Sequence, residues 1–483
     1  MQMIKRVSLN IIVKALIIHI SLMCFSALIA DAAIRRAALD SIPGDLPRPK
    51  ITVSKNTADG NIFAAVPYWG NGTPYLVIYD NKGNPLAYRK TAATCADFKR
   101  QDNGLLTYYD YASQKFFGMD SSLNIVDSFW VNNGFTTDEH DIKILPNGNV
   151  LLIGNGIRFY DMNQYVQGGD SHASVIVNVV QEIDNKRNVV FEWKAYEHYR
   201  LTDVSPAVNL LAPSFVHTQI NSIDVDRDNN LILSARNLDE ITKIDRRTGE
   251  FIWRMGGKNN QFSFVNDSTG FSAQHSVTVL PNGNLLVYDN GLFHKPHFSR
   301  AIEYELDQAN KTAMMTWSFR NTPDIASVFW GNAQRLKNGN TLIGWGMSGT
   351  AATEVSPGGE KVFEMIFPAD VFSYRVFRFP IGTPSNITNV PHAGTLPEYR
   401  LHQNFPNPFN SATTITYELP ATTRVILKIY DFLGREVRVL VDGERGAGEH
   451  RAVADLQALS SGVYFYRIVA GNVTRMRSML YLK

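Results

Sequence analysis

The chain has 483 residues, of which 44% are hydrophobic, so it is long enough for two or three domains with sizeable cores. Its 47 Lys and Arg residues nearly balance its 45 Asp and Glu residues, which excludes a strongly basic protein. We therefore expect neither nucleic acid nor an anionic membrane surface as a partner.

The N-terminal residues 1–32 have the pattern of an export signal. Lys5 and Arg6 give a positive start before the apolar segment 15–30, and Ala30-Asp31-Ala32 is a small-x-small cleavage site. The alternative is an uncleaved membrane anchor, but the apolar segment is short for a membrane-spanning helix, which needs about 20 residues. We expect cleavage, after which Cys95 would be the only cysteine and no internal disulfide could form.

One hairpin pattern recurs in the middle of the chain. Each copy has a strand of alternating hydrophobic residues, a polar turn of the Pro-Asn-Gly-Asn type, and a second strand. The copies are residues 95–110, 139–155, 220–237, 270–291 and 333–346. A second hairpin pattern, clearest in residues 240–257, lies between them.

Two hairpins make a four-stranded unit, and the repetition of such units predicts a β-propeller. With an imperfect first unit around residues 75–90, the sequence predicts six blades within residues 50–380. We expect an insertion in the third blade, at residues 161–171 or 196–215. The alternative is one large β-sandwich, which the regular repeat disfavours. The predicted fold class is therefore all-β, with a six-bladed β-propeller followed by a small C-terminal β-sandwich.

Polar residues occupy the same position in three of the repeated hairpins. His140, Asn221 and His275 each lie nine residues before the last Asn of the turn, where the other two copies have Ala96 and Gly331. The innermost strand of every propeller blade lines a central channel, so equivalent positions form a ring. Each histidine taken alone could be structural, but the shared position favours a common polar site.

Three further polar residues should lie opposite this ring across the hairpin turns. Arg236 should lie close to Asn221, and Asn155 and Asn290 should lie close to the two histidines. Guanidinium and amide donors suit an anion with tetrahedral oxygens, and an imidazole can act as a nucleophile or as an acid–base group.

We expect no metal ion and no cofactor. No acidic cluster is expected beside the channel histidines, and His294 and His297 lack a third metal ligand nearby. The sequence has no P-loop, no Rossmann glycine pattern and no Gly-x-Ser-x-Gly elbow.

Four stretches of the chain resemble the arylsulfotransferase (aryl-sulfate sulfotransferase) family. They are residues 217–267, 271–291 (FSAQHSVTVLPNGNLLVYDNG), 299–321 and 331–346, and the resemblance covers about residues 60–378. It implies a six-bladed propeller that moves a sulfuryl group from one phenol to another, without a nucleotide sulfate donor. The implied mechanism is ping-pong, through a transiently sulfated histidine.

The resemblance also implies roles for individual residues. The family's nucleophilic histidine corresponds to His275, its arginine to Arg236, its asparagine to Asn221 and its other channel histidine to His140. These last three would stabilise charge on the sulfuryl oxygens. His140 or His217 would protonate the departing phenolate.

Two positions depart from the family pattern. A second histidine is expected two residues before Asn221, where this chain has Gln219, and His217 lies two residues earlier still. A shift of two positions along a strand moves a side chain about 6–7 Å, so His217 would reach the site only if the strand bulges. Ser276 follows His275 where many relatives have an acid. Aromatic residues that could stack on the phenols at the channel mouth are Trp330, Tyr288 and Phe293.

A second domain is predicted at residues 398–483, after a Pro-, Thr-, Asn- and Gly-rich linker at 381–397. Its alternating segments predict a sandwich of about seven strands. Residues 401–420 (LHQNFPNPFNSATTITYELP) and 473–483 (VTRMRSMLYLK) resemble the type IX secretion C-terminal sorting domain. This implies a Bacteroidetes-like envelope, the type IX machinery as partner, and passage through the periplasm to the cell surface or medium. The alternative is a carbohydrate-binding or adhesive sandwich.

Two function classes remain open. The first is a secreted aryl sulfotransferase with a small phenolic donor and a small phenolic acceptor. The second is a non-catalytic propeller that binds a sulfated or phenolic ligand, which Gln219 and Ser276 keep open. A quinone-dependent dehydrogenase is suggested by residues 244–253, but this motif occurs well formed only once. The sequence gives no indication of the oligomeric state.

Overall fold

A computed structural model of the chain describes residues 42–66, 73–380, 388–389, 400–404, 406–407, 409–419, 422–431, 435–470 and 473–481. The chain divides into two compact units, Met1–Pro391 and His392–Lys483. Within the described ranges, no helix is long and apolar enough to cross a membrane. The predicted signal segment 1–32 and most of the predicted linker 381–397 lie outside the described residues.

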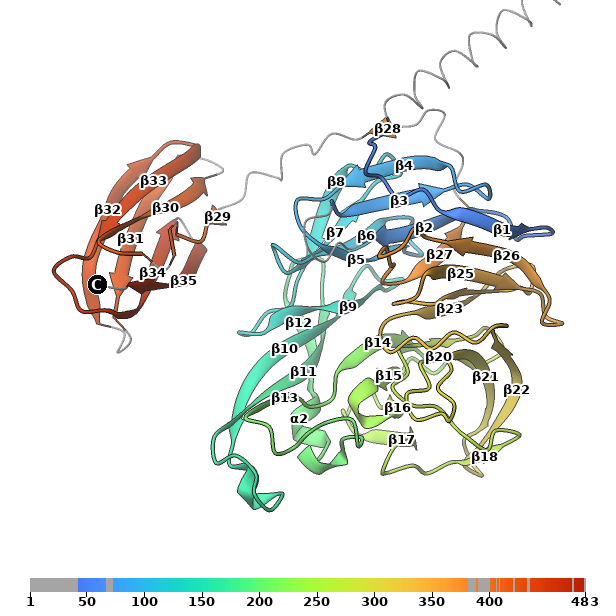
Figure 1. The fold of residues 1–483 in the computed structure, drawn as a ribbon. Helices are drawn as coiled ribbons and strands as arrows, with labels where there is room; N and C mark the ends of the chain where they lie inside the picture. Colours follow the sequence, from blue (N-terminus) through green and yellow to red (C-terminus); the bar gives the residue numbers. More distant parts are fainter. Residues whose placement is uncertain are drawn as a thin grey trace, which may run out of the picture. The chain divides into compact units, whose positions relative to one another are not determined.

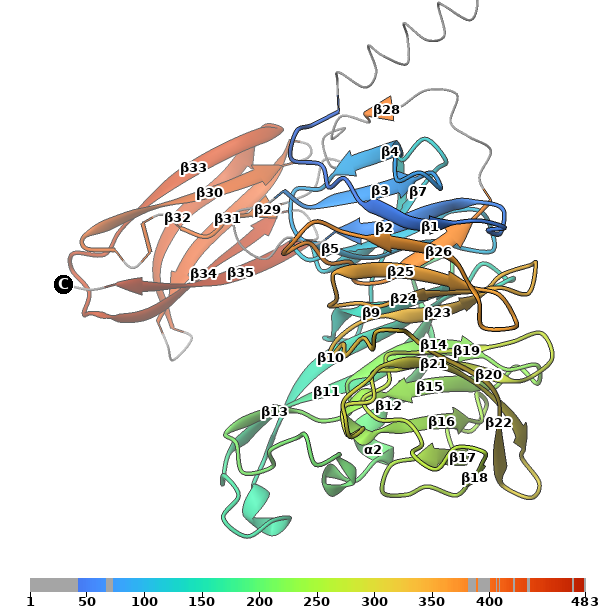
Figure 2. The same ribbon diagram turned by 45° about the vertical axis from the view of Figure 1, so that its right-hand side comes forward.

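The described part of the first unit contains six β-sheets, which we number in chain order (Figures 1 and 2). Sheet 1 has the order β27 (Val376–Phe379), β2 (Asn61–Val66), β3 (Tyr75–Tyr79), β4 (Pro85–Lys90) and β28 (Thr388–Asn389). Sheet 2 consists of β5 (Cys95–Arg100), β6 (Leu106–Asp110), β7 (Lys115–Met119) and β8 (Ile125–Phe129). Sheet 3 consists of β9 (Thr136–Ile144), β10 (Val150–Tyr160), β11 (Ala173–Ile183) and β12 (Val189–Lys194), with β13 (Ser214–Val216) parallel to β11.

The other three sheets follow the same plan. Sheet 4 consists of β14 (Ile220–Val225), β15 (Leu231–Ala235), β16 (Glu240–Ile244) and β17 (Phe251–Gly256). Sheet 5 consists of β19 (Ser276–Val279), β20 (Leu285–Asp289), β21 (Arg300–Asp307), β22 (Thr312–Arg320) and β18 (Ser263–Val265). Sheet 6 consists of β23 (Asn332–Arg335), β24 (Thr341–Gly344), β25 (Thr350–Val355), β26 (Lys361–Ile366) and β1 (Lys50–Ser54). The predicted all-β class is confirmed.

In the described part of the first unit, short helical segments lie within sheet 3, between sheets 3 and 4, and within sheet 4. They are η1 (Met162–Gln164), α2 (Ala195–His198), η2 (Leu201–Asp203) and η3 (Arg236–Leu238). The strands β10 and β11 pair over eleven residues and extend as a long hairpin, visible in both views. The tip of this hairpin and the segment that holds α2 and η2 occupy both predicted insertion positions.

The repeated polar turns build the expected hairpins, which are β5–β6, β9–β10, β14–β15, β19–β20 and β23–β24. In the turn between β19 and β20, Leu280 N donates to Asn284 O and Gly283 N donates to Leu280 O, both at 2.8 Å. Gly283 has a φ of 94°, a left-handed conformation that costs a side-chain-bearing residue energy. The copy without this glycine has Asn229 at the same point with a φ of 67°, and Asn tolerates this region best.

Among the hydrophobic clusters in the described part of the first unit, six join two successive sheets each. One cluster, for example, packs Leu151 and Val180 of sheet 3 against Ile220 and Leu233 of sheet 4. The remaining clusters join sheets 1 and 2, 2 and 3, 4 and 5, 5 and 6, and finally 6 and 1. Each sheet therefore buries its two faces against the sheets before and after it.

In each sheet, the strand that we named first above contacts the equivalent strands of the two neighbouring sheets, and we call it the inner strand. These six inner strands are β27, β5, β9, β14, β19 and β23. Side chains of one inner strand bond the backbone of the next: Asp141 Oδ2 accepts from Ile223 N at 3.0 Å, and Asp224 Oδ2 accepts from Val279 N at 2.8 Å. Residues of all six inner strands line one shared cavity of about 520 Å³.

Both ends of the first unit contribute strands to a sheet formed mainly by the other end. The N-terminal β1 pairs with β26 in sheet 6, and the C-terminal β27 pairs with β2 in sheet 1. Asn332 of β23 reinforces this junction, because its side-chain amide bonds Val376 N and Val376 O, both at 3.0 Å. The first and last segments of the unit are thereby held together.

The described part of the second unit contains two sheets that share one hydrophobic cluster. One sheet consists of β29 (Arg400–Leu401), β30 (Ala412–Leu419) and β33 (Gly448–Asp455). The other consists of β32 (Glu436–Arg445), β31 (Thr423–Tyr430), β34 (Gly462–Ala470) and β35 (Val473–Tyr481). Strand β30 alternates partly buried and buried residues over its whole length, as expected for a strand with one face on a core.

Candidate functional site

Three inner strands bring His140, Asn221 and His275 into one buried region. His140 lies within β9, Asn221 near the start of β14, and His275 directly before β19. The ring centroids of His140 and His275 are 5.5 Å apart. Asn221 Nδ2 donates to Gln274 O at 2.8 Å, so the amide lies against the residue that precedes His275. Of the predicted site residues, these three form one group.

The imidazole of His275 has one occupied and one open nitrogen. Its Nδ1 lies 3.0 Å from Gly331 O, and a carbonyl can only accept, so the proton sits on Nδ1. Its Nε2 is buried and has no hydrogen-bond partner among the described residues. Burial and the positive charges of Arg375 and His140 hold the pKa of His275 well below 6.5. The ring is therefore neutral near pH 7, with a free lone pair on Nε2.

His140 has the opposite electrostatic environment. Its Nδ1 bonds Asp138 Oδ1 at 2.6 Å, and its backbone N–H donates to the same oxygen at 2.9 Å. Burial alone would lower its pKa, but the negative charges of Asp138 and Glu139 raise the pKa to about 9. The site therefore pairs a cationic imidazole with a neutral one, the arrangement that separates an acid from a nucleophile or base.

The expectation that no acidic cluster accompanies the channel histidines is wrong. Asp138, Glu139 and His140 offer potential metal-ligand atoms within 4.8 Å of one another. His140 Nδ1 and Asp138 Oδ1 are 2.6 Å apart and form an ion pair. The imidazole nitrogen that faces the carboxylate is therefore already bonded and is not free to bind a metal ion. We therefore assign no metal ion to this group.

Arg236 reaches the site from η3, directly after β15. Its Nη2 donates to Val328 O at 3.0 Å, and its guanidinium lies 4.9 Å from the ring centre of Phe329. Its Nε is buried without a hydrogen-bond partner in the described part of the chain. Asp239 ends this short helix and accepts a hydrogen bond from Ala273 N at 2.6 Å, which ties Arg236 to the segment before His275.

The cross-strand expectations are met only in part. A bulge separates Ile220 from Ser222, and the β14–β15 ladder pairs Ile220 with Ala235, next to Arg236. Asn155 Nδ2 donates to Asp138 Oδ2 at 2.7 Å, so Asn155 reaches His140 through that carboxylate. Asn290 instead donates to the backbone oxygens of Ser327 and Trp330.

His217 does not join the group. Its Nε2 contacts Arg200 O at 3.0 Å, and burial lowers its pKa. No contact between described residues links its ring to His140 or His275. Gln219, two residues on, has a φ of 47°, and its carbonyl accepts from Arg236 N at 3.1 Å.

Four residues beside the site have a left-handed backbone, as do eleven other described non-glycine residues elsewhere in the chain. Non-glycine residues in the left-handed region include Gln219 before Asn221, Asp239 after Arg236, Ala273 before His275 and Trp330 before Gly331, with φ values of 47°, 51°, 51° and 66°. Each such residue costs about 1–3 kcal/mol, a cost that folded proteins concentrate at functional sites.

Tyr374 and Arg375, which precede β27, are site residues that the sequence reasoning missed. Tyr374 packs edge-on against His275 at 5.3 Å between ring centres, and its hydroxyl donates to His140 O at 3.0 Å. Arg375 donates to the backbone oxygens of Asn221 and His275, at 2.6 and 3.2 Å. Neither Tyr374 nor Arg375 belongs to a repeated motif that would mark it in the sequence. The available signal was the short strand-like segment 376–379 that follows them.

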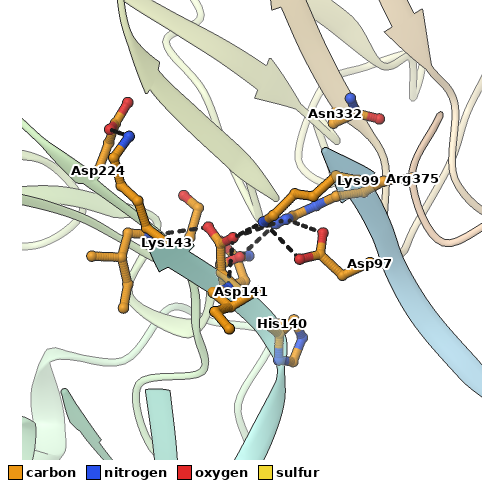
Figure 3. A network of polar contacts seen from close by, with 12 residues as sticks. Asp97, Lys99, His140, Asp141, Lys143, Asp224, Asn332 and Arg375 are labelled. Carbon is orange, nitrogen blue, oxygen red and sulfur yellow. Dashed lines mark hydrogen bonds and ion pairs between the residues drawn. The ribbon is translucent and has the colours of Figure 1, made fainter. Parts of the chain in front are cut away.

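Arg375 also belongs to a charged network near His140, most of whose residues line the shared cavity (Figure 3). Its Nη1 bonds Asp97 Oδ1 at 2.9 Å, and Lys99 Nζ lies 2.6 Å from Asp97 Oδ2. Lys99 also pairs with Asp141, and Lys143 pairs with Asp224. Four inner strands or the segments next to them are joined by these charges, which fixes the backbone that carries the two histidines.

The expected aromatic residues differ in exposure. Tyr288 is fully buried beneath Gly331, and its hydroxyl donates to Trp345 O at 3.3 Å, so its ring packs between sheets 5 and 6. Trp330 is partly buried, with its ring 5.9 Å from that of Tyr374. Phe293 and Phe329 are 43% and 45% exposed. Phe293 N donates to Ser272 Oγ, close to His275, and Phe329 lies under Arg236, so both are near the site.

Comparison with known proteins identifies two families. A family model described as Arylsulfotransferase (ASST) matches residues 50–375, and a model described as Secretion system C-terminal sorting domain matches residues 403–481. No curated protein matches the chain significantly.

Solved structures give distant similarities. A protein of unknown function from Bacteroides caccae shares 13% identity, covering 66% of this chain and 98% of its own, with a TM-score of 0.42. PorZ of the type-IX secretion system of Porphyromonas gingivalis shares 13% identity, covering 88% and 59%, with a TM-score of 0.36. Virginiamycin B lyase from Staphylococcus aureus shares 10% identity, covering 84% and 99%, with a TM-score of 0.33.

Proposed function

Because the chain belongs to the arylsulfotransferase family, we propose that it transfers a sulfuryl group from an aryl sulfate to a phenol through a sulfated His275. The observation that carries the proposal is the pair of unlike imidazoles. His275 is neutral with an open Nε2, and His140, 5.5 Å away, is held in its charged form.

In the first half-reaction, Nε2 of His275 attacks the sulfur of the donor. An N–S bond forms while the S–O bond to the aryl group breaks, and the departing phenolate takes a proton from His140. In the second half-reaction, the acceptor phenol gives its proton to His140 and its oxygen attacks the same sulfur. The N–S bond breaks, and both histidines return to their starting forms.

Two neighbouring side chains would stabilise the charge on the sulfuryl oxygens. Arg236 offers a guanidinium fork that is fixed by Val328 O and the Phe329 ring, and its Nε has no protein partner within the described chain. Asn221 uses one N–H of its amide on Gln274 O and keeps the second as a neutral donor. Preorganised donors of this kind are worth about 10²–10³-fold each in rate. The exposed rings of Phe293 and Phe329 would stack on the two phenols.

We infer that the six sheets are the blades of a six-bladed propeller. The inner strands contact one another in sequence, the clusters join sheet to sheet through all six, and β1 and β27 tie the two ends together. We likewise infer a sandwich from the two sheets of the second unit that share one core. The C-terminal type IX sorting domain indicates secretion or cell-surface attachment in Bacteroidetes.

A chromogenic assay tests the proposed function. With a nitrophenyl sulfate as donor, we expect nitrophenol release only when a phenol acceptor is present, and none from His275→Ala. His172→Ala, which removes an exposed histidine stacked on Phe159, is the matched control and should keep wild-type activity. Wild-type binding of the donor without any turnover would favour the alternative, a non-catalytic ligand-binding propeller, which the replacement of a family histidine by Gln219 keeps open.

A further inference from the structure

Asp138 makes three hydrogen bonds, two to His140 and one to Asn155. Its Oδ1 accepts from both the ring Nδ1 and the backbone N–H of His140, at 2.6 and 2.9 Å. Its Oδ2 accepts from Asn155 Nδ2 at 2.7 Å. The carboxylate is 4% exposed, so these bonds hold it in one orientation with little competition from water.

The chain of hydrogen bonds continues from Asp138 across sheet 3 to the start of β14. Asn178 Nδ2 donates to Asn155 Oδ1 at 2.8 Å, and Asn178 Oδ1 accepts from Thr218 Oγ1 and Ile220 N at 2.6 and 2.9 Å. Ile220 directly precedes Asn221, so this relay joins the segment that carries Asn221 to the carboxylate that holds His140. A buried polar relay with every member bonded fixes side-chain positions closely.

Charged and titratable groups face His140 from three sides. Asp138 and Glu139 lie on its own strand, His275 lies 5.5 Å away before β19, and Tyr374 and Arg375 come from the segment before β27. Among the described residues, only Asp138 contacts the ring through a hydrogen bond, and that bond is to Nδ1. The Nε2 nitrogen is thereby the one left to exchange a proton with a substrate.

We propose that Asp138, held by Asn155, is a positioning residue that keeps a proton on Nδ1 of His140 and makes His140 the acid for the departing phenol. This inference rests on the proposed function. During transfer, the proton on Nε2 of His140 moves to the phenolate oxygen as the S–O bond breaks, and Nδ1 keeps its proton throughout. The neutral imidazole that results is the base that accepts the proton of the incoming phenol.

The dependence of the rate on the leaving group tests this role. A nitrophenolate leaves without protonation, whereas a phenolate from a weakly acidic phenol needs the acid. In Asp138→Asn, we expect less than about 10-fold loss with a nitrophenyl sulfate but about 10²–10⁴-fold loss with an alkyl-substituted phenyl sulfate, the range that acid–base catalysis supplies. Asp161→Asn, at the exposed N-cap of η1 and away from His140, is the matched control and should leave the rates with both donors unchanged.

An NMR titration of the histidines in the full chain provides a readout that does not depend on turnover. In wild type, the pKa of His140 should lie near 9, and in Asp138→Asn it should fall to 6.5 or below. Equal losses for both donors, or an unchanged His140 titration in a folded Asp138→Asn chain, would overturn the proposal. If wild type transfers no sulfuryl group from any donor, the proposed function fails, and the role of Asp138 in the reaction fails with it. The titration then still shows whether Asp138 and His140 form an ion pair.

Discussion

The two histidines at the centre of the site are the same residue type with opposite electrostatic surroundings. Asp138 and Glu139 favour the charged form of His140, and burial with the nearby cations disfavours that of His275. Neither property follows from a histidine's own chemistry, since its ordinary pKa of about 6.5 would leave both rings partly charged. At the residue scale, function is therefore decided by which neighbours each ring has.

This difference predicts a bell-shaped pH profile. His275 must be neutral to attack, so activity should be lost as the pH falls through its lowered pKa, below 6.5. His140 must be charged to donate its proton, so activity should be lost as the pH rises through about 9. Measurement of kcat/KM against pH for an alkyl-substituted phenyl sulfate, whose phenolate needs the acid, in the presence of a saturating acceptor checks this. An acidic limb above 6.5 would show that His275 is not the group that must lose its proton.

Arg236→Lys tests whether the planar fork is needed or only its charge. Lysine keeps the positive charge but loses the guanidinium that Val328 O and the Phe329 ring hold in place. We expect kcat to fall about 10²-fold with a much smaller change in KM, because the interaction strengthens in the transition state. Arg320→Lys, in an exposed pair with Asp324, is the control and should change neither constant. Full activity of Arg236→Lys would exclude a fork-shaped contact.

Part of the site could be predicted from one sequence. The shared position relative to the turns brought together His140, Asn221 and His275, because a hairpin fixes its register through its turn. Asp138 lies two residues before His140, but its bond to the imidazole could not be predicted. A contact between two side chains of one strand leaves no periodic pattern in the sequence. The ring of His217 bonds Arg200 O, on the segment between sheets 3 and 4, and its part in the site stays a prediction.

At the element scale, the segment that leads into β23 fixes the tautomer of His275. Gly331 accepts the Nδ1 proton through its carbonyl and has a φ of 97°. A Cβ added there would lie 2.2 Å from Cε1 of Tyr288, a ring that is fully buried. The equivalent position therefore has glycine for a physical reason, although three other hairpins carry His140, Asn221 and His275 there.

Gly331→Ala should consequently disturb both stability and catalysis. Gly148→Ala is the matched control, because Gly148 has a φ of 84° and no atom within 4 Å of an added Cβ. We expect the control to lose about 1–2 kcal/mol of unfolding free energy, the cost of a left-handed alanine, with normal activity. Gly331→Ala should lose about 1–3 kcal/mol more through overpacking and should lower kcat. Denaturant unfolding and donor turnover measure the two effects, and equal stability of the two variants would contradict the clash.

The sequence predicted elements that form locally and missed those that form at a distance. All five hairpins follow from turns whose glycine or asparagine adopts a positive φ. The pairing of β1 with β26, and of β27 with β2, joins residues about three hundred positions apart and has no turn to mark it. Tyr374 and Arg375 lie before β27, so missing that strand meant missing them.

At the scale of the whole molecule, we expect one unit to carry out the proposed chemistry and the other to direct export. The site residues all lie in the first unit, and the match to the sorting domain lies in the second. A chain that ends after residue 380 keeps β27 and Arg375 and should remain active when purified, but it should be retained in the periplasm. Cell fractionation together with the chromogenic assay checks both expectations. Surface display of the shortened chain would contradict an export role for the second unit.

Detection of the covalent intermediate tests the central claim most directly. The wild-type chain would be mixed with an aryl sulfate in the absence of acceptor, quenched in alkali and analysed by peptide mass spectrometry. We predict one added sulfuryl group on the peptide that contains His275, released by acid or by addition of a phenol. A sulfuryl group on any other residue, or none during active turnover, would contradict transfer through His275.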